Sequence, residues 1–252
     1  MRALWWREII RFVRQRSRVI GAFAQPLLFW ILLGGGFSAS FRPPGTPGDV
    51  GALQYFYPGI IALVLLFTAI FATIAVVEDR KSGFLQGVLV APIPRGSIVL
   101  GQALGGTTLA VLQGVLFLAL APLAGISLSL LSIVAVTLVL VGVSFALTNL
   151  GLVIAWRMES TQGFHAIMNL ILMPIWLLSG AFFPAAGAPG WLGWVMRLNP
   201  LTYGMAALRR ALYLSVPAAS GAVPPFALSI FVTAVFSLVA FAGATTVARR
   251  AR

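Results

Sequence analysis

The sequence has no cysteine, a single histidine and only five acidic residues. Without cysteine the chain forms no disulfide, and it offers no thiol nucleophile and no thiolate metal ligand. A lone histidine with no acidic residue beside it cannot build a usual metal site. Charged residues make up 9% of the chain, whereas a soluble domain is about a quarter charged. These absences exclude thiol chemistry and argue against a soluble fold.

The sequence also lacks the motifs that mark common hydrolytic sites. It has no His-Glu-x-x-His, no Gly-x-Ser-x-Gly and no Gly-x4-Gly-Lys-Ser/Thr phosphate loop. We therefore expect no catalytic residue, no metal site and no cofactor on this chain, which is predicted not to be an enzyme. Because the phosphate loop is missing, ATP and its Mg²⁺ could act only through a partner chain.

Six long apolar stretches account for most of the chain, which is 60% hydrophobic with a mean hydropathy of +1.01. A helix needs about 20 apolar residues to cross the hydrocarbon core of a bilayer. The sequence therefore predicts an all-α polytopic membrane protein with one transmembrane domain over residues 1–252 and no internal repeat. The expected spans are Val19–Phe41, Tyr55–Val77, Ile98–Pro122, Leu128–Ile154, Phe164–Phe183 and Phe226–Val247.

Basic residues predict the orientation of these spans, because cytoplasmic loops retain an excess of Lys and Arg. Thirteen of the 17 basic residues fall on one side if the N-terminus is cytoplasmic. Both termini are then expected in the cytoplasm, with the chain in a bacterial plasma (inner) membrane. Topology and anionic lipid headgroups account for the net charge of +12, so no nucleic-acid partner is expected. The basic residues on the opposite side would be Arg42, Arg197, Arg209 and Arg210.

Two segments outside the spans are predicted to lie at the membrane surface. Residues 1–18 contain an amphipathic helix over Ala3–Arg18, with arginines along one stripe at 7, 11, 14 and 18. Residues 184–225 are the longest stretch on the outer side, and Trp191 and Trp194 favour a re-entrant or interfacial segment. Asn199-Pro200 predicts a helix start there, because Asn is a good N-cap and Pro suits the first helical position.

Residues 78–97, between the second and third spans, combine charge with a short apolar run. Pro92 and Pro94 should end any helix in this segment. A helix this short can neither span the membrane nor form a core, so it must rest against the membrane surface or another protein. Physical reasoning alone leaves both possibilities open. The apolar residues that recur at helical spacing are Phe84, Leu85, Val88 and Leu89.

Polar side chains at membrane depth are candidates for function, although amides more often link neighbouring helices. For His165, near the predicted cytoplasmic end of the fifth span, packing or interface placement is the simpler explanation. Gly101 and Gly105 form a small-xxx-small pair suited to close helix packing, and Pro174 should kink the fifth span. The other polar residues of this kind are Gln25, Gln102, Gln113, Asn149 and Asn169.

Two motifs resemble those of one known family. The first is Glu-Asp-Arg-Lys-Ser-Gly-Phe-Leu-Gln-Gly-Val-Leu-Val-Ala-Pro-Ile-Pro-Arg (Glu78–Arg95), and the second is Leu-Leu-Ser-Gly-Ala-Phe-Phe-Pro (Leu177–Pro184) with Leu-Asn-Pro-Leu-Thr-Tyr (Leu198–Tyr203). They are similar to the segment after helix two and to the "SG-x-FFP … NPLTY" signature of type 2 ATP-binding-cassette (ABC) exporter permeases. The resemblance covers nearly the whole chain. Phe84 departs from it, since many relatives have Thr or Ser there.

The resemblance implies a coupling helix that docks into a separate ATPase subunit, with the loop Arg157–Gln162 as a smaller second contact. Two permease chains and two ATPase chains would form the exporter, and the substrate path would run along the permease dimer interface. ATP-driven closure of the ATPases would swing the spans from inward-open to outward-open. The implied coupling residues are Glu78, Asp79, Gly83, Phe84, Leu85, Val88, Leu89, Pro92, Pro94 and Arg95. The implied outer-gate residues are Ser179, Gly180, Phe183, Pro184, Asn199, Pro200 and Tyr203.

Three classes of function remain open at this point. An exporter permease, moving a drug, a lipid or a lipid-linked saccharide, would need an ATPase partner. A carrier or channel independent of ATP would show a buried ion site, yet no acidic residue is expected at mid-membrane depth. An accessory membrane scaffold would bind partners without changing flux. The resemblance favours the exporter, and export over import rests on the resemblance and on the lack of a receptor-docking domain.

Overall fold

The computed structural model describes residues 2–36, 50–183 and 188–250, and this part of the chain contains helices and no strand. Six of the helices are long and apolar enough to cross a membrane, which confirms the predicted number. The helices are α1 (Arg2–Arg14), α2 (Arg16–Gly36), α3 (Ala52–Lys81), α4 (Phe84–Val90), α5 (Arg95–Leu118), α6 (Leu130–Ala155), α7 (Thr161–Trp176), α8 (Gly190–Leu198), α9 (Pro200–Leu212) and α10 (Phe226–Arg250).

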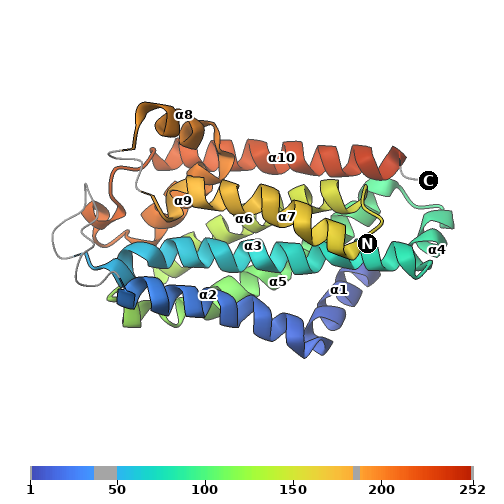
Figure 1. Cartoon of the computed structure of the whole chain (residues 1–252), viewed down its shortest axis with the longest axis horizontal. Coiled ribbons are helices and arrows are strands. Elements are labelled where there is room, and N and C mark those ends of the chain that lie inside the picture. The colour runs from blue at the N-terminus through green and yellow to red at the C-terminus, as the bar shows by residue number, and fades with distance from the viewer. Residues whose placement is uncertain (1, 37–49, 184–187, 251–252) are drawn as a thin grey trace.

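Helix α3 is one of the six candidate spans and lies at the centre of the bundle, with the other five arranged around it (Figure 1). In the most apolar stretch of α3, 89% of the residues are buried, against 22% in α2 and in α10. Helices α2, α5, α6 and α7 all pack against α3, and α10 packs against α6 and α9. The outer helices therefore carry broad apolar faces that a bilayer or a second protein has to cover.

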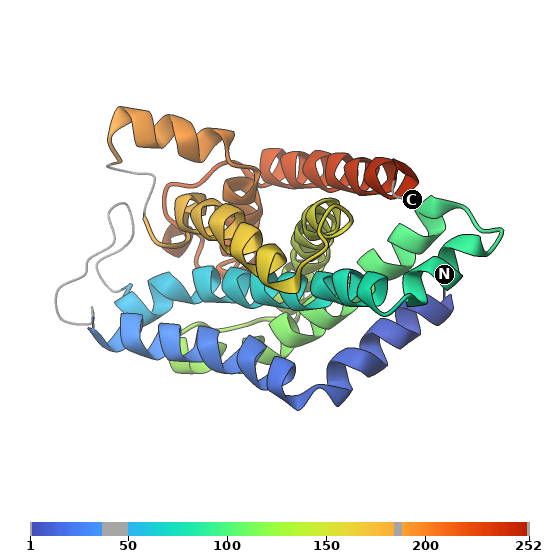
Figure 2. The same ribbon diagram turned by 45° about the vertical axis from the view of Figure 1, so that its right-hand side comes forward.

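The two ends of the bundle differ in what they carry (Figures 1 and 2). One end holds α4 together with the first residues of α1 and the last residues of α10, and we name it the α4 end. The opposite end holds α8 and the start of α3, and we name it the α8 end. Figure 2 also shows α1 and α2 forming a V along one side of the bundle.

The N-terminal region differs from the single helix predicted over Ala3–Arg18. The helix breaks at Gln15, where the backbone N–H of Gln15 bonds the carbonyl of Phe12 at 3.1 Å. Helix α2 begins at Arg16, and the first candidate span within it starts at Val19, as predicted. The predicted continuation of this span to Phe41 lies beyond the described residues, which stop at 36. Position 15 is therefore the corner of the V.

Glycine permits close contacts between elements at two places. A Cβ on Gly105 of α5 would stand 2.7 Å from the Cβ of Glu8 on α1, so the predicted small-residue position is a point of close packing. A Cβ on Gly59 of α3 would stand 2.8 Å from the carbonyl oxygen of Ala181. Side chains at these positions would push α1 away from α5, and the 177–181 turn away from α3.

The fifth candidate span is α-helical through Pro174 and changes its geometry only after Trp176. Helix α7 accommodates Pro174 and continues to Trp176, and one π-helical turn follows over Leu177–Ala181. Gly180 has φ of 83°, in the left-handed region that residues with a Cβ rarely adopt. Helix α7 therefore continues through Pro174, where the sequence predicts a kink, and the break in this span lies at Gly180.

Candidate functional site

The chain passes from α3 to α4 through a turn of only two residues. Ser82 caps α3 and its N–H bonds the carbonyl of Glu78 at 3.0 Å. Gly83 follows with φ of 76°, which reverses the chain direction at low cost because glycine has no Cβ. Pro92 and Pro94 follow the end of α4, and Arg95 begins α5. The short helix predicted for residues 78–97 is thus confirmed as α4.

The apolar face predicted for α4 is divided between the interior and the surface. Leu85 is 2% exposed and packs in the main hydrophobic core of the protein. Val88 and Leu89 are half-buried and pack against the same core, whereas Phe84 is 40% exposed and Val90 is 86% exposed. Any partner at this end of the bundle would therefore meet Phe84 and Val90, while Leu85 belongs to the fold itself.

A cluster of ion pairs joins α1 to the end of α3. The Arg7 guanidinium binds the Asp79 carboxylate through two parallel contacts, Nη1 to Oδ2 at 2.6 Å and Nη2 to Oδ1 at 2.7 Å. Arg11 donates to Asp79 Oδ1 at 2.7 Å and to Glu78 Oε2 at 2.6 Å. The Asp79 side chain is 4% exposed. A paired geometry of this kind is the strong form of an arginine–carboxylate contact.

The same cluster reaches α4 and fixes the position of α1. The Arg7 guanidinium carbon lies 3.9 Å from the centre of the Phe84 ring, a cation–π contact. Hydrogen bonding to Asp79 raises the pKa of Arg7, so this guanidinium stays charged. Trp5 adds a hydrogen bond from Nε1 to Thr108 Oγ1 of α5 at 3.1 Å. Arg7 and Arg11 therefore bind carboxylates instead of facing headgroups, which corrects the prediction of a uniform arginine stripe.

The loop predicted as a second contact lies at the same end of the bundle. Arg157, Glu159 and Gln162 are exposed, and Ser160 caps α7 by accepting a hydrogen bond from the N–H of Gly163 at 3.3 Å. Arg80 of α3 donates to the carbonyl oxygen of Trp156 at 2.8 Å. This bond joins the end of α3 to the end of α6, so α3 is anchored on two sides of the α4 end.

At the α8 end, the residues of the second motif surround the turn at 177–181. Ser179 Oγ donates to the carbonyl of Trp176 at 2.6 Å. Asn199 caps α9, since its Oδ1 accepts from the N–H of Leu201 at 3.0 Å while its Nδ2 donates to the carbonyl of Ile175 at 2.6 Å. Pro200 is the first residue of α9, as predicted. The Asn199 side chain thus joins the start of α9 to the end of α7.

The remaining residues of this motif are more peripheral. Tyr203 donates from its hydroxyl to the carbonyl of Arg197 at 3.1 Å, which ties α9 to α8. Phe183 is 48% exposed. Pro184 lies outside the described residues. The structure therefore brings Ser179, Gly180 and Asn199 together with Tyr203 nearby, and it leaves Phe183 at the surface.

Arg209 of α9 is a buried cation that the sequence reasoning placed only as an outer basic residue. It is 4% exposed and donates to the carbonyls of Gly180 at 3.1 Å and Tyr55 at 3.3 Å. Its guanidinium carbon lies 4.3 Å from the centre of the Tyr55 ring. Its position four residues after Met205, within the apolar stripe of this helix, could have indicated burial.

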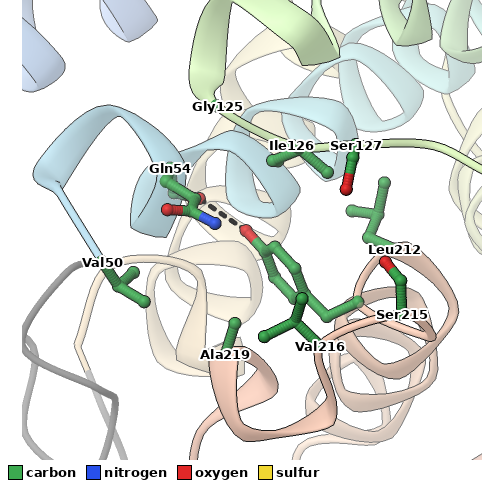
Figure 3. A pocket seen from close by; sticks show the side chains of 10 residues that line it. Val50, Gln54, Gly125, Ile126, Ser127, Leu212, Ser215, Val216 and Ala219 are labelled. Atoms are coloured by element: carbon green, nitrogen blue, oxygen red, sulfur yellow. Dashed lines mark hydrogen bonds between the residues drawn. The ribbon is translucent and has the colours of Figure 1, made fainter.

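A small cavity opens beside this cluster at the α8 end (Figure 3). It has a volume of about 160 Å³ and is lined by uncharged residues, among them Gln54, Ser127 and Ser215. The Tyr213 hydroxyl donates to the backbone carbonyl of Gln54 at 2.8 Å, and burial raises the pKa of this hydroxyl. Pro58 lacks the N–H that would otherwise bind this carbonyl within α3, so Tyr213 replaces the missing donor.

The polar residues predicted at membrane depth fall into two groups. Gln102, Gln113 and Asn149 are buried within the bundle, where Gln113 accepts a hydrogen bond from Thr68 of α3. Gln25 on α2 and Asn169 on α7 are exposed on the outside. His165 is half-buried between rings, with centres 6.3 Å from Phe71 and 6.1 Å from Phe164. Among the described residues no three His, Cys, Asp or Glu side chains group as metal ligands.

Six apolar helices, one of which is the buried central helix α3, define the class of this protein, which is a multi-pass helical membrane protein. Residues 1–213 match the ABC-2 type transporter family, and the chain belongs to that family of ABC transporter permeases. The match includes both motifs that carried the resemblance. The recognition of the family from these motifs is therefore confirmed.

Individual relatives agree with this assignment. The "Putative transport permease ycf38" of Cyanophora paradoxa is 29% identical over 210 residues, which are 81% of this chain and 70% of the relative. "Nodulation protein J" of Rhizobium leguminosarum bv. viciae is 26% identical over 256 residues, 98% of this chain and 93% of the relative. The "Probable multidrug ABC transporter permease YbhR" of Escherichia coli K12 is 29% identical over 153 residues, 58% of this chain and 40% of the relative.

Proposed function

We propose that this chain is the transmembrane subunit of an ATP-driven exporter, in which two copies of the chain work with two copies of a separate ATPase. Membership of the ABC-2 family supports the need for an ATPase partner. The observation that carries the proposal is the α4 end, where a short helix with an exposed apolar edge is joined to α1 by the Arg7–Asp79 pair. An exposed apolar edge held by a rigid ionic cluster suits the docking of a protein.

We place the α4 end in the cytoplasm of a bacterial cell, with the chain in the plasma (inner) membrane. Both ends of the described chain and α4 lie at this end (Figure 1). It also carries the basic residues near the start of α1 and the end of α10, as the retention of Lys and Arg on the cytoplasmic side requires. An ATPase that uses cytoplasmic ATP would then meet α4 directly.

Docking on α4 would be transmitted along two routes. Pressure on the exposed residues Phe84 and Val90 would move α4, and Leu85 would carry this movement into the core around α3. Arg7, in contact with both Phe84 and Asp79, would carry it to α1 and so to the V formed with α2. Glu78, Gly83, Pro92, Pro94 and Arg95 then shape and hold the coupling segment and need not touch the ATPase.

The substrate path is proposed at the interface between two copies of the chain, along α2 and α7. Gln25 and Asn169 are exposed on these helices at membrane depth, where an amide in contact with lipid is costly. A second copy or a hydrated path would satisfy these amides. At the α8 end the turn around Ser179 and Gly180, held by Asn199 and Arg209, would form the outer gate. The path suits a hydrophobic or amphipathic cargo such as a drug, a lipid or a lipid-linked saccharide.

The proposal is tested by purifying the chain together with the ATPase encoded beside it and measuring ATP-dependent efflux. Val90→Asp should abolish both ATPase recovery and efflux while leaving the chain folded. Leu123→Asp is the matched control, because Leu123 is 71% exposed at the α8 end. An ATPase that stays bound to the Val90→Asp chain would refute docking on α4. Flux without nucleotide would instead favour the carrier, and partner binding with no effect on flux would favour the scaffold.

A further inference from the structure

An apolar groove lies on the outside of the bundle, where α1 and α2 meet α5. It has a volume of about 270 Å³, and its walls are almost entirely aliphatic and aromatic. Ile20 of α2 and Leu112 and Leu116 of α5 line it and are each more than half exposed. The groove therefore faces whatever surrounds the protein at the level where the first candidate span begins.

The floor of the groove is held in place from within the bundle. Gln113 lines the groove, is 4% exposed and accepts a hydrogen bond from Thr68 on the central helix α3. Phe12 of α1, which is 5% exposed, also lines the groove. The groove thus combines a buried floor with exposed aliphatic side chains at its rim.

The mouth of the groove is positively charged. Arg16 lines it, and Arg14 lies exposed on the last turn of α1. Among the described residues neither of these arginines forms an ion pair, because Glu8, Glu78 and Asp79 pair with Arg7 and Arg11. The first candidate span starts at Val19, three residues after Arg16. Arg16 is therefore at headgroup depth, and the apolar groove extends beside it into the hydrocarbon layer.

We propose that this groove binds one acyl chain of an anionic phospholipid, whose phosphate lies against Arg16 and Arg14. The aliphatic walls suit an acyl chain, and the two arginines suit an anionic headgroup better than a zwitterionic one, whose amine they would repel. A second copy of this chain is a poorer occupant, because it would bring its own arginines close to the same positively charged mouth, and like charges repel. The bound lipid would stabilise the packing of the α1–α2 corner at Gln15 against α5.

Native mass spectrometry of the purified full chain in detergent tests this proposal, with phosphatidylglycerol and phosphatidylethanolamine as the added probes. We expect one phosphatidylglycerol per chain to bind at least ten times more tightly than phosphatidylethanolamine. The double variant Arg14→Gln/Arg16→Gln should lose this preference. Arg249→Gln/Arg250→Gln is the matched control, since both residues are exposed at the α4 end, and it should keep the preference.

A second pair of variants tests the groove itself. Leu112→Trp fills the groove and should lower phosphatidylglycerol binding at least tenfold, whereas Leu131→Trp, on an exposed part of α6, should leave it unchanged. The thermal melting of each variant shows that it is folded. Equal binding of the two lipids, or full binding to Leu112→Trp, would overturn the proposal. Loss of chain–chain association in Leu112→Trp with lipid binding intact would make the groove an interface between copies and would also overturn it.

The proposal goes beyond the exporter function and requires only that the chain spans a bilayer. Failure of the lipid experiment would leave the ATPase experiment unaffected, because the groove residues and α4 have no residue in common. Conversely, a chain that binds no ATPase could still show the lipid preference. The two outcomes are therefore separable in one set of purified variants.

Discussion

Arg7 on α1 lies over the ring of Phe84, the first residue of α4, with 3.9 Å between the guanidinium carbon and the ring centre. The same guanidinium holds Asp79 of α3 through two hydrogen bonds. One side chain therefore connects three helices at the α4 end. Because α1 continues through Gln15 into the first candidate span, a change at α4 can reach α2 without passing through α3.

Asp79→Asn should weaken this connection and destabilise the chain. The variant leaves Arg7 and Arg11 without the carboxylate that both bind. Removing one partner of a buried ion pair costs about 3 kcal/mol or more. We expect the apparent melting temperature in detergent, followed by tryptophan fluorescence, to fall by about 5 °C or more.

Glu78→Gln is the matched control for this experiment. The Glu78 side chain is 29% exposed and pairs with Arg11, and a pair exposed to this extent contributes about 1 kcal/mol or less. Equal melting temperatures for the two variants would show that Asp79 is not the centre of the cluster.

Gly83→Ala should destabilise helix α4, whereas Gly87→Ala should stabilise it. Gly83 has φ of 76°, so an added Cβ strains the backbone by about 1–2 kcal/mol. Gly87 lies inside α4 with open space around it, so alanine should favour this helix by about 1 kcal/mol. Amide hydrogen exchange over Phe84–Val90 should be faster in Gly83→Ala and slower in Gly87→Ala. The reverse order would mean that the turn before α4 tolerates other conformations.

Leu85→Asp should unfold the α4 end, and its phenotype should not be taken as loss of docking alone. Leu85 is 2% exposed, and burying a carboxylate there costs about 3 kcal/mol or more. Val90 is 86% exposed, so Val90→Asp should melt like the unmodified chain. Size-exclusion profiles and melting curves in detergent distinguish the two. A Leu85→Asp chain as stable as the Val90→Asp chain would show that α4 detaches from the core.

Arg209→Gln should loosen the α8 end more than Arg210→Gln does. Arg209 loses its bonds to the carbonyls of Gly180 and Tyr55, at a cost of about 2–3 kcal/mol. Arg210 is half-buried and bonds the nearby carbonyls of Val223 and Pro224, within its own region of the chain. Hydrogen exchange at residues 177–181 should therefore accelerate in Arg209→Gln. Unchanged exchange there would mean that Asn199 holds this turn by itself.

Single cysteines test the orientation, because the chain has none of its own to give background labelling. Ser82→Cys, at the exposed turn before α4, should react with a membrane-impermeant maleimide only after the cells are opened. Thr46 lies outside the described residues, and the sequence places it in the first outer loop, so Thr46→Cys should react in intact spheroplasts. Labelling in the opposite pattern would place the α4 end outside the cell and would rule out an ATPase on α4.

Much of the fold follows from hydropathy, because a long apolar run has few alternatives to a membrane span. Helix α3 (Ala52–Lys81) exceeds the predicted Tyr55–Val77 at both ends, since polar residues such as Glu78 and Asp79 continue the helix beyond its apolar part. The break at Gln15 was missed because no proline or glycine marks it. The kink was predicted at Pro174 because proline is a strong local signal, whereas the break lies at Gly180, six residues later.

The sequence located the segments that form the site, but it did not predict which side chains of these segments contact one another. The motifs located α4 and the start of α9, yet the pairing of Arg7 with Asp79 joins residues 72 positions apart. Likewise, Arg209 meets Tyr55 across 154 positions. Neither helical periodicity nor a local motif predicts contacts between residues that are so far apart in the sequence. The burial of Leu85 was missed for the same reason, because spacing identifies an apolar face without saying what covers it.

Both clusters are attached to the same helix, and this has a mechanical consequence. Asp79 and Tyr55 are 24 residues apart on α3, which corresponds to about 36 Å at 1.5 Å per residue. A continuous helix enclosed on every side behaves as a lever whose two arms are rigidly joined. If α3 tilts as one body, the Asp79 end and the Tyr55 end move in opposite directions, so the helix itself joins the two clusters mechanically.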